Sequence, residues 1–169
     1  MSKYTLVAWT EDGEVRMIPS LINEMSVPYR EKIERIEAQW ETVENEIGWL
    51  IAQSKAHEEF ARFLLRVGRP REAYDEFKNA AEVCSLCSDE LWLQGETCGY
   101  PALPLLHRFL AMHRECMKLV RSDRYLQGCY YGSWFDSQYL FYTNDEWETH
   151  LELKEAYETR RAWRFGRGA

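Results

Sequence analysis

The sequence lacks two features that mark common binding partners: a long apolar run and an excess of positive charge. A membrane-spanning helix needs about 20 consecutive apolar residues, and no such run is present, so we expect no membrane partner. The 169 residues include 21 Lys and Arg against 28 Asp and Glu, a net charge of −7. Nucleic acid binding depends on clustered basic side chains, so we expect no nucleic acid partner either.

Signals for secretion and for catalysis are also missing. The N-terminal residues include acids where a signal peptide needs an apolar block, which predicts a cytoplasmic protein. No glycine-rich phosphate loop is present, and none of the four histidines belongs to a nucleophile motif. His57 and His113 lie on apolar stripes, where a lone histidine is more often a hydrogen-bonded core residue than a general base. We therefore expect a protein that is not an enzyme and needs no cofactor.

The five cysteines are an odd number without secretory context, which favours reduced thiols. Cys84-x-x-Cys87 and His113-x-x-Cys116 together offer four side chains of the types that bind zinc. The 25 residues between the two pairs are more than a compact zinc ribbon has, and buried cysteine also behaves as a small hydrophobe. Structural thiols are our preferred interpretation; a zinc site, or a redox role for the first pair, is the alternative.

Residues 54–87 have the pattern of two helices joined by a tight turn. Apolar residues from His57 to Leu65 recur with a period of 3.6 and predict the first helix. Gly68 can take a positive φ and end that helix, while Pro70 suits the first turn of the next. The second helix is expected to run to about Val83. Its inner face consists of Ala73, Tyr74, Phe77, Ala80 and Ala81.

This segment resembles a tetratricopeptide repeat. The matching positions are Ala61, Leu64, Gly68, Ala73, Phe77 and Ala80. It departs from the family at His57, where a large apolar residue is usual, and at Ser85, which replaces the terminal proline. No clean second copy follows, although three or more repeats normally form a stable stack. The resemblance implies a mainly α fold, with antiparallel helical hairpins packed as a short, irregular TPR-like solenoid or bundle.

The flanking segments predict further strands and helices. Residues 4–9 and 14–18 surround Glu11-Asp12-Gly13, as in a β-hairpin, and residues 139–142 form another possible strand. A helix is expected over 103–120. The last helix is expected from Asn144 to about Trp163, because Thr143 and Glu146 have the spacing of a capping box.

A helix after Ser26, with Pro28 in its first turn, carries a seam of apolar residues with heptad spacing. The seam consists of Tyr29, Ile33, Ile36, Trp40, Val43, Ile47 and Leu50. It fits either a homodimer contact through helix 29–47 or one amphipathic helix packed on the repeat. Gly48 marks either a turn before the repeat or a bend in one long helix.

The whole chain is predicted to form a single domain, residues 1–169. Its parts are a lead-in over 1–24, a helical region over 26–122 and an aromatic-rich segment with a terminal helix over 123–169. Nine of the 23 residues from Tyr125 to Trp147 are Tyr, Phe or Trp. Such a belt either seals the last helix onto the fold or lines a peptide groove. We expect Tyr130, Tyr131 and Trp134 to be its most exposed members.

Two functions fit these observations. The first is a non-catalytic adaptor whose concave face near His57, Phe60, Arg62 and Arg66 captures a peptide or a partner helix. The two arginines are four residues apart and either bind a carboxylate or phosphate together or are simply solvated. The second is an acidic inhibitor, immunity or counter-defence protein that masks a basic surface of an enzyme, because negative charge speeds association with a cationic target.

Overall fold

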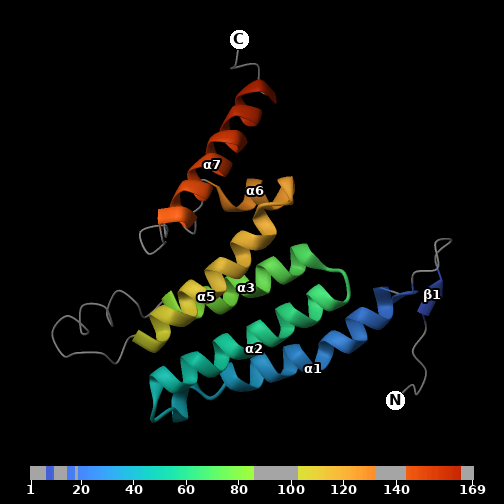
Figure 1. Ribbon diagram of the computed structural model, residues 1–169. Helices are drawn as coiled ribbons and strands as arrows, with labels where there is room; N and C mark the ends of the chain where they lie inside the picture. Colours follow the sequence, from blue (N-terminus) through green and yellow to red (C-terminus); the bar gives the residue numbers. More distant parts are fainter. Residues whose placement is uncertain (1–6, 10–14, 18, 86–102, 132–143, 165–169) are drawn as a thin grey trace. The chain divides into compact units, whose positions relative to one another are not determined.

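The computed structural model describes residues 7–9, 15–17, 19–85, 103–131 and 144–164, which are mainly helical (Figure 1). The mainly α prediction is therefore confirmed. The chain divides into two compact units, Met1–Cys116 and Met117–Ala169, so that the boundary falls inside helix α5. The assignment of residues 1–169 to one domain stays a prediction. No helix of the described residues is long and apolar enough to cross a membrane.

Two short strands precede the helices. Strand β1 (Val7–Trp9) pairs antiparallel with β2 (Val15–Met17), with Val7 opposite Met17. The expected turn at 11–13 lies outside the described residues, and the complete hairpin stays a prediction. The strand expected over 139–142 also lies outside them.

Helix α1 (Pro19–Glu37) begins earlier than the sequence pattern suggests. Ser26 was expected to be its N-cap, but the Ser26 hydroxyl is buried and donates to the Ile22 carbonyl inside the helix, at 2.7 Å. Pro28 therefore lies within the helix. It has no N–H to donate to the Glu24 carbonyl one turn earlier. The prediction that the helix starts at Ser26 is wrong, because Pro28, although typical of a first turn, here lies inside a helix that begins at Pro19.

The expected continuous helix over 29–47 is also wrong. Helix α1 ends at Glu37, a 3₁₀ turn η1 (Trp40–Thr42) follows, and helix α2 (Glu46–Arg66) begins after its N-cap Asn45. The Asn45 Oδ1 accepts from the Gly48 N–H at 3.0 Å, so Gly48 is neither a turn nor a bend but lies in the first turn of α2. The homodimer seam expected along 29–47 is therefore interrupted.

The N-terminal part of that seam packs within the chain. Tyr29 of α1 stacks on two rings of α2, with centroids 5.7 Å from Phe60 and 4.8 Å from Phe63. Ile33 and Leu50 are buried. The alternative interpretation, an amphipathic helix packed on the repeat segment, is the arrangement seen.

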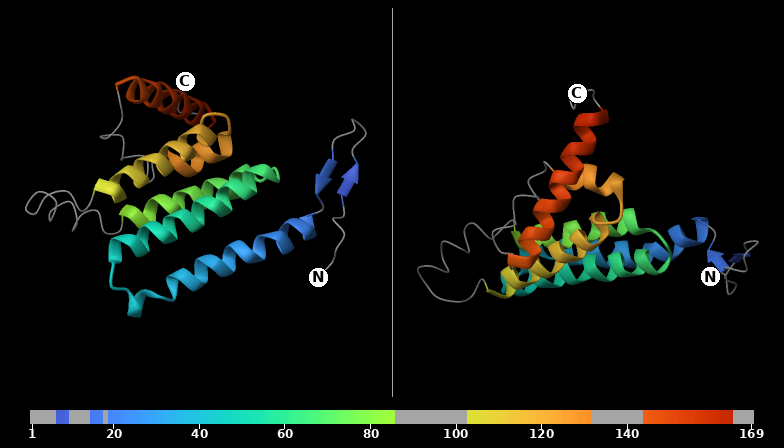
Figure 2. Two further views of the ribbon diagram at one scale, coloured as in Figure 1. Left: turned by 60° about the horizontal axis from the view of Figure 1, so that its bottom comes forward. Right: turned by 45° about the horizontal axis from the view of Figure 1, so that its top comes forward.

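Helices α2 and α3 (Pro70–Ser85) form the expected antiparallel hairpin, side by side in both views of Figure 2. Gly68 has φ 77°, which is the positive φ predicted for the turn. Small side chains let the two helix axes approach closely, and the larger ones fill the remaining space. Fully or almost fully buried in this hairpin are Ala61, Leu64, Ala73, Tyr74, Phe77, Ala80, Ala81 and Cys84.

Helix α5 (Leu103–Val120) has the predicted bounds. Its part in the first unit faces the hairpin, because the Cys116 thiol lies 3.8 Å from the Tyr74 carbonyl of α3. Both side chains are buried.

The second unit contains the end of α5, helix α6 (Arg124–Tyr130) and helix α7 (Asn144–Arg164). Helix α6 was not predicted, whereas α7 has nearly the expected bounds; its proposed cap Thr143 lies outside the described residues. The buried Gln127 amide donates to the Val120 carbonyl at 3.1 Å and accepts from Arg160 of α7. Tyr131 packs against Tyr157, with centroids 5.2 Å apart.

Candidate functional site

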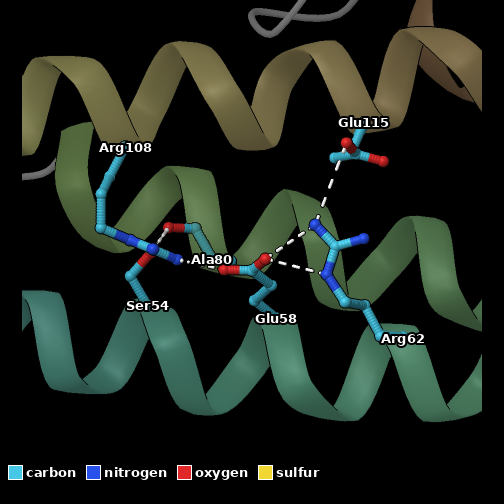
Figure 3. Close-up of polar contacts among 6 residues, drawn as sticks. All are labelled: Ser54, Glu58, Arg62, Ala80, Arg108 and Glu115. Carbon is cyan, nitrogen blue, oxygen red and sulfur yellow. Dashed lines mark hydrogen bonds and ion pairs between the residues drawn. The ribbon is translucent and has the colours of Figure 1, made fainter.

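A connected network of polar side chains joins α2, α3 and α5. Its side chains, here called the interhelix cluster, are Ser54, Glu58, Arg62, Arg108 and Glu115 (Figure 3). The first three recur every four residues, which places them on one side of α2. The other two come from α5.

Arg108 connects α5 to two consecutive turns of α2. Its Nε donates to the Ser54 Oγ at 3.0 Å, and its terminal nitrogen donates to the Glu58 Oε1 at 2.9 Å. The Ser54 hydroxyl in turn donates to the Ala80 carbonyl of α3 at 2.8 Å. The buried serine therefore links three helices as donor and acceptor (Figure 3).

Arg62 approaches the other oxygen of Glu58. Its Nε and a terminal nitrogen lie 2.9 and 2.7 Å from Oε2, and the same terminal nitrogen is 3.9 Å from Glu115. The Arg62 guanidinium also lies over the Phe77 ring, 5.5 Å from its centroid. Burial by itself raises the pKa of Glu58, but the hydrogen bonds and the positive charges of Arg108 and Arg62 together outweigh burial, so that the pKa is lowered.

The chemistry of the interhelix cluster follows from this pairing. A carboxylate held ionised by two guanidinium groups is a poor general acid and a poor proton acceptor. The two arginines in turn have carboxylate partners within the chain. The arrangement is suited to fixing α5 against the hairpin.

His57 belongs to a second polar contact, which involves α1, α2 and α3. Its Nδ1 lies 2.7 Å from the Glu76 Oε2 of α3, and its Nε2 lies 3.7 Å from the Glu37 Oε1 at the end of α1. The side chain is buried. His57 thus connects α1, α2 and α3, as a polar core residue does.

The four side chains predicted for the adaptor's binding face do not form one open surface. Phe60 is buried under Tyr29, and His57 is buried as described. Arg62 reaches toward α5, whereas the terminal nitrogen of Arg66 lies 3.5 Å from the Tyr29 hydroxyl of α1. The two arginines therefore do not converge on one ligand position.

The exposure predicted for the aromatic belt is wrong where it falls on described residues. Tyr130 is 0% exposed and Tyr131 is 5% exposed. Both belong to the packing of the second unit, where their rings meet edge to face at 5.1 Å. Trp134 lies outside the described residues.

The alternative zinc site gains no support from the described residues. Cys84, His113 and Cys116 are buried, and burial raises the pKa of the Cys116 thiol well above its ordinary value. Cys87 lies outside the described part of the chain. Within that part, no three His, Cys, Asp or Glu side chains are placed to hold a metal ion.

The most exposed large hydrophobic side chain among the described residues is Trp40, at 63%. It lies in the connection between α1 and α2, here called the acidic elbow and comprising residues 37–46. Its four glutamates are all exposed: Glu37, Glu41, Glu44 and Glu46. Sequence reasoning assigned Trp40 to the apolar seam. The sequence feature that could have indicated this exposed segment is its charge, because no Lys or Arg occurs between Arg35 and Lys55.

Hydrogen bonds hold the acidic elbow in one conformation. The indole N–H of Trp49, in the first turn of α2, donates to the Ile36 carbonyl at the end of α1, at 2.7 Å. Within the elbow, the Thr42 hydroxyl and backbone N–H both approach the Gln39 carbonyl, at 3.1 and 3.0 Å. Trp40 is therefore presented from a fixed backbone.

Comparison of the chain with protein-family models, with curated proteins and with solved structures finds no match.

Proposed function

We propose that this chain is a non-catalytic protein–protein interaction module that acts as an adaptor in the cytoplasm and binds a peptide or helix of another protein. The finer form of its fold belongs to the same proposal: a short, irregular TPR-like solenoid or bundle, with a β-hairpin near the N-terminus. The hairpin of α2 and α3, with the expected turn at Gly68, supports the repeat-like part of this description.

The exposure of Trp40 carries the proposal. An indole offers a large, rigid contact area, and tryptophan is among the residues that contribute most to binding at protein interfaces. The polar side chains that resemble a site, in contrast, pair with one another. Arg108 and Arg62 share the Glu58 carboxylate, and His57 lies against Glu76.

A second function is favoured by the charge of the acidic elbow. Four exposed glutamates in the same ten-residue segment as an exposed tryptophan suit an acidic inhibitor, immunity or counter-defence protein that covers a basic surface of an enzyme. The two functions differ in their effect on the partner. An inhibitor abolishes the activity of a partner enzyme at stoichiometric amounts, whereas an adaptor leaves that activity unchanged.

Site-specific photo-crosslinking in the cells that naturally make the protein tests the general proposal. A photoreactive phenylalanine analogue is placed at four exposed positions: Glu41, Asn79, Tyr125 and Glu148. We expect a discrete protein adduct from at least one position, identified by mass spectrometry. If all four positions give only the uncrosslinked chain, the interaction module is refuted.

A further inference from the structure

We infer that the acidic elbow is the docking surface and that its partner is a protein with a basic surface surrounding an apolar pocket for the Trp40 indole. This inference rests on the proposed function and specifies the face and the chemistry of the partner. Three independent properties of the elbow lead to it: the exposed anchor, the sign of the surrounding charge and the fixed backbone.

The anchor is the first property. At 63% exposure Trp40 contributes little to the core of its own chain. Trp49, nine residues later, shows the alternative, because it is half-buried and its indole N–H is bonded to the Ile36 carbonyl. A tryptophan that the fold does not need is well placed to fill a pocket on a partner.

The charge determines the kind of partner. The 19 residues between Arg35 and Lys55 contain four glutamates and no basic residue, so the formal charge of the stretch that carries Trp40 is of one sign. Negative potential steers a cationic surface toward the elbow and disfavours an acidic one. A Lys or Arg side chain is also attracted to the face of an indole. A second copy of this chain, at net charge −7, is a poor complement.

The fixed backbone makes binding less costly. The contact of Trp49 with Ile36 and the Asn45 cap hold both ends of the elbow, and η1 holds its middle. A side chain presented from an ordered segment loses less conformational entropy on binding than one on a mobile loop. The acidic elbow therefore has the properties of a preorganised binding epitope.

The photo-crosslinking positions given above separate this inference from the general proposal. We expect the Glu41 position to give the predominant adduct, and we expect the crosslinked peptide of the partner to lie on a basic surface. Adducts only at Asn79, Tyr125 or Glu148 overturn the acidic elbow as the docking surface while leaving an interaction module in place. No adduct at any position overturns both. An adduct of Glu41 with a second copy of this chain overturns the basic partner.

Two matched variants of the full chain then test anchor and charge against the purified partner. Trp40→Ala is expected to weaken the affinity by about 30-fold or more, whereas Tyr125→Ala, which removes another exposed aromatic, leaves it within about twofold. Glu41→Gln with Glu44→Gln is expected to slow association several-fold at low salt and to reduce its salt dependence. Glu24→Gln with Glu31→Gln removes the same charge from exposed positions of α1 and is the control. The inference is contradicted if Trp40→Ala weakens the affinity no more than Tyr125→Ala does and if the two double Glu→Gln variants slow association equally.

Discussion

The interhelix cluster and the acidic elbow are both rich in charge, but they use it in opposite ways. In the cluster, Glu58 pairs with Arg62 of its own helix and with Arg108 of α5, and Ser54 joins three helices. In the elbow, four exposed glutamates and no Lys or Arg occupy the same ten residues as an exposed indole. Removal of one member of a paired set leaves the other charge without its partner and destabilises the fold, whereas negative charge close to an exposed indole favours a cationic partner.

The same contrast applies to single side chains of the two regions. Arg62 has a basic side chain on a helix face, as an anion-binding residue does, but its partner is Glu58 of its own helix. Trp40 has the spacing of a core residue but is exposed. Residue type alone therefore does not distinguish the two regions. What distinguishes them is whether a side chain of opposite charge, or the packed core, meets the residue within the chain.

The largest expected effect is in the core behind the interhelix cluster. Phe77→Ala removes a fully buried ring that also lies under the Arg62 guanidinium. We expect the free energy of unfolding to fall by about 3–5 kcal/mol, because a cavity adds to the lost transfer energy. Urea denaturation followed by circular dichroism measures this. Val27→Ala, at an exposed position of α1, is the control and should change stability by less than about 0.5 kcal/mol.

Glu58→Gln removes the charge shared by two arginines of the interhelix cluster. At pH 7 we expect a loss of about 2 kcal/mol in the free energy of unfolding. The pKa of Glu58 is lower in the folded chain than its ordinary value, so its stabilising contribution is present above about pH 4.3 and is lost as the pH falls through the folded-state pKa. Denaturation of both proteins from pH 7 to pH 3 should therefore show the difference shrinking with acid.

The adjacent glutamate is the matched control for this prediction. Glu59 pairs with Lys32 at the surface, where both side chains are about half exposed, and such pairs contribute little. Glu59→Gln should cost less than about 0.5 kcal/mol at pH 7. If it costs as much as Glu58→Gln, the contrast between a compensated internal carboxylate and a surface one is wrong.

Trp49→Phe tests the rigidity of the acidic elbow. Phenylalanine keeps an aromatic ring but cannot donate to the Ile36 carbonyl. We expect stability to fall by about 1 kcal/mol and amide hydrogen exchange of residues 38–45 to accelerate. Unchanged exchange in that segment would show that the indole hydrogen bond does not hold the elbow.

Trp40→Ala should have the smallest effect on folding. Because the indole is mostly exposed, we expect a change in the free energy of unfolding of less than about 0.5 kcal/mol, measured by the same denaturation experiment. A loss above about 2 kcal/mol would place Trp40 in the core and remove the contrast between the two regions.

The helical hairpin was predictable because its signals are local. Gly68 gave the turn, and the spacing of the alanines and Phe77 gave the buried face of α3. The start of α1 was not predictable in this way, because proline usually marks the first turn of a helix, whereas Pro28 lies inside one. The break after Glu37 was hidden because the apolar spacing continues through Trp40 and Val43 although the helix does not.

The interhelix cluster was not predictable for a different reason. Arg108 is 50 residues from Glu58 in the sequence, and nothing local in either segment indicates the other as its partner. The sequence around a charged residue such as Arg62 therefore does not show whether a carboxylate from another helix pairs with it in the fold. Tyr130 and Tyr131 illustrate the same difficulty, since dense aromatics are compatible with exposure and with the burial observed.

The Gln127 amide has a consequence for how the second unit opens. One buried side chain contacts the backbone at the end of α5 and the Arg160 side chain of α7. Loss of α6 would remove bonds from both helices at once, so the three segments form one cooperative opening unit. In native-state hydrogen exchange, amides near the end of α5, in α6 and around Arg160 should then share one opening free energy and one dependence on denaturant.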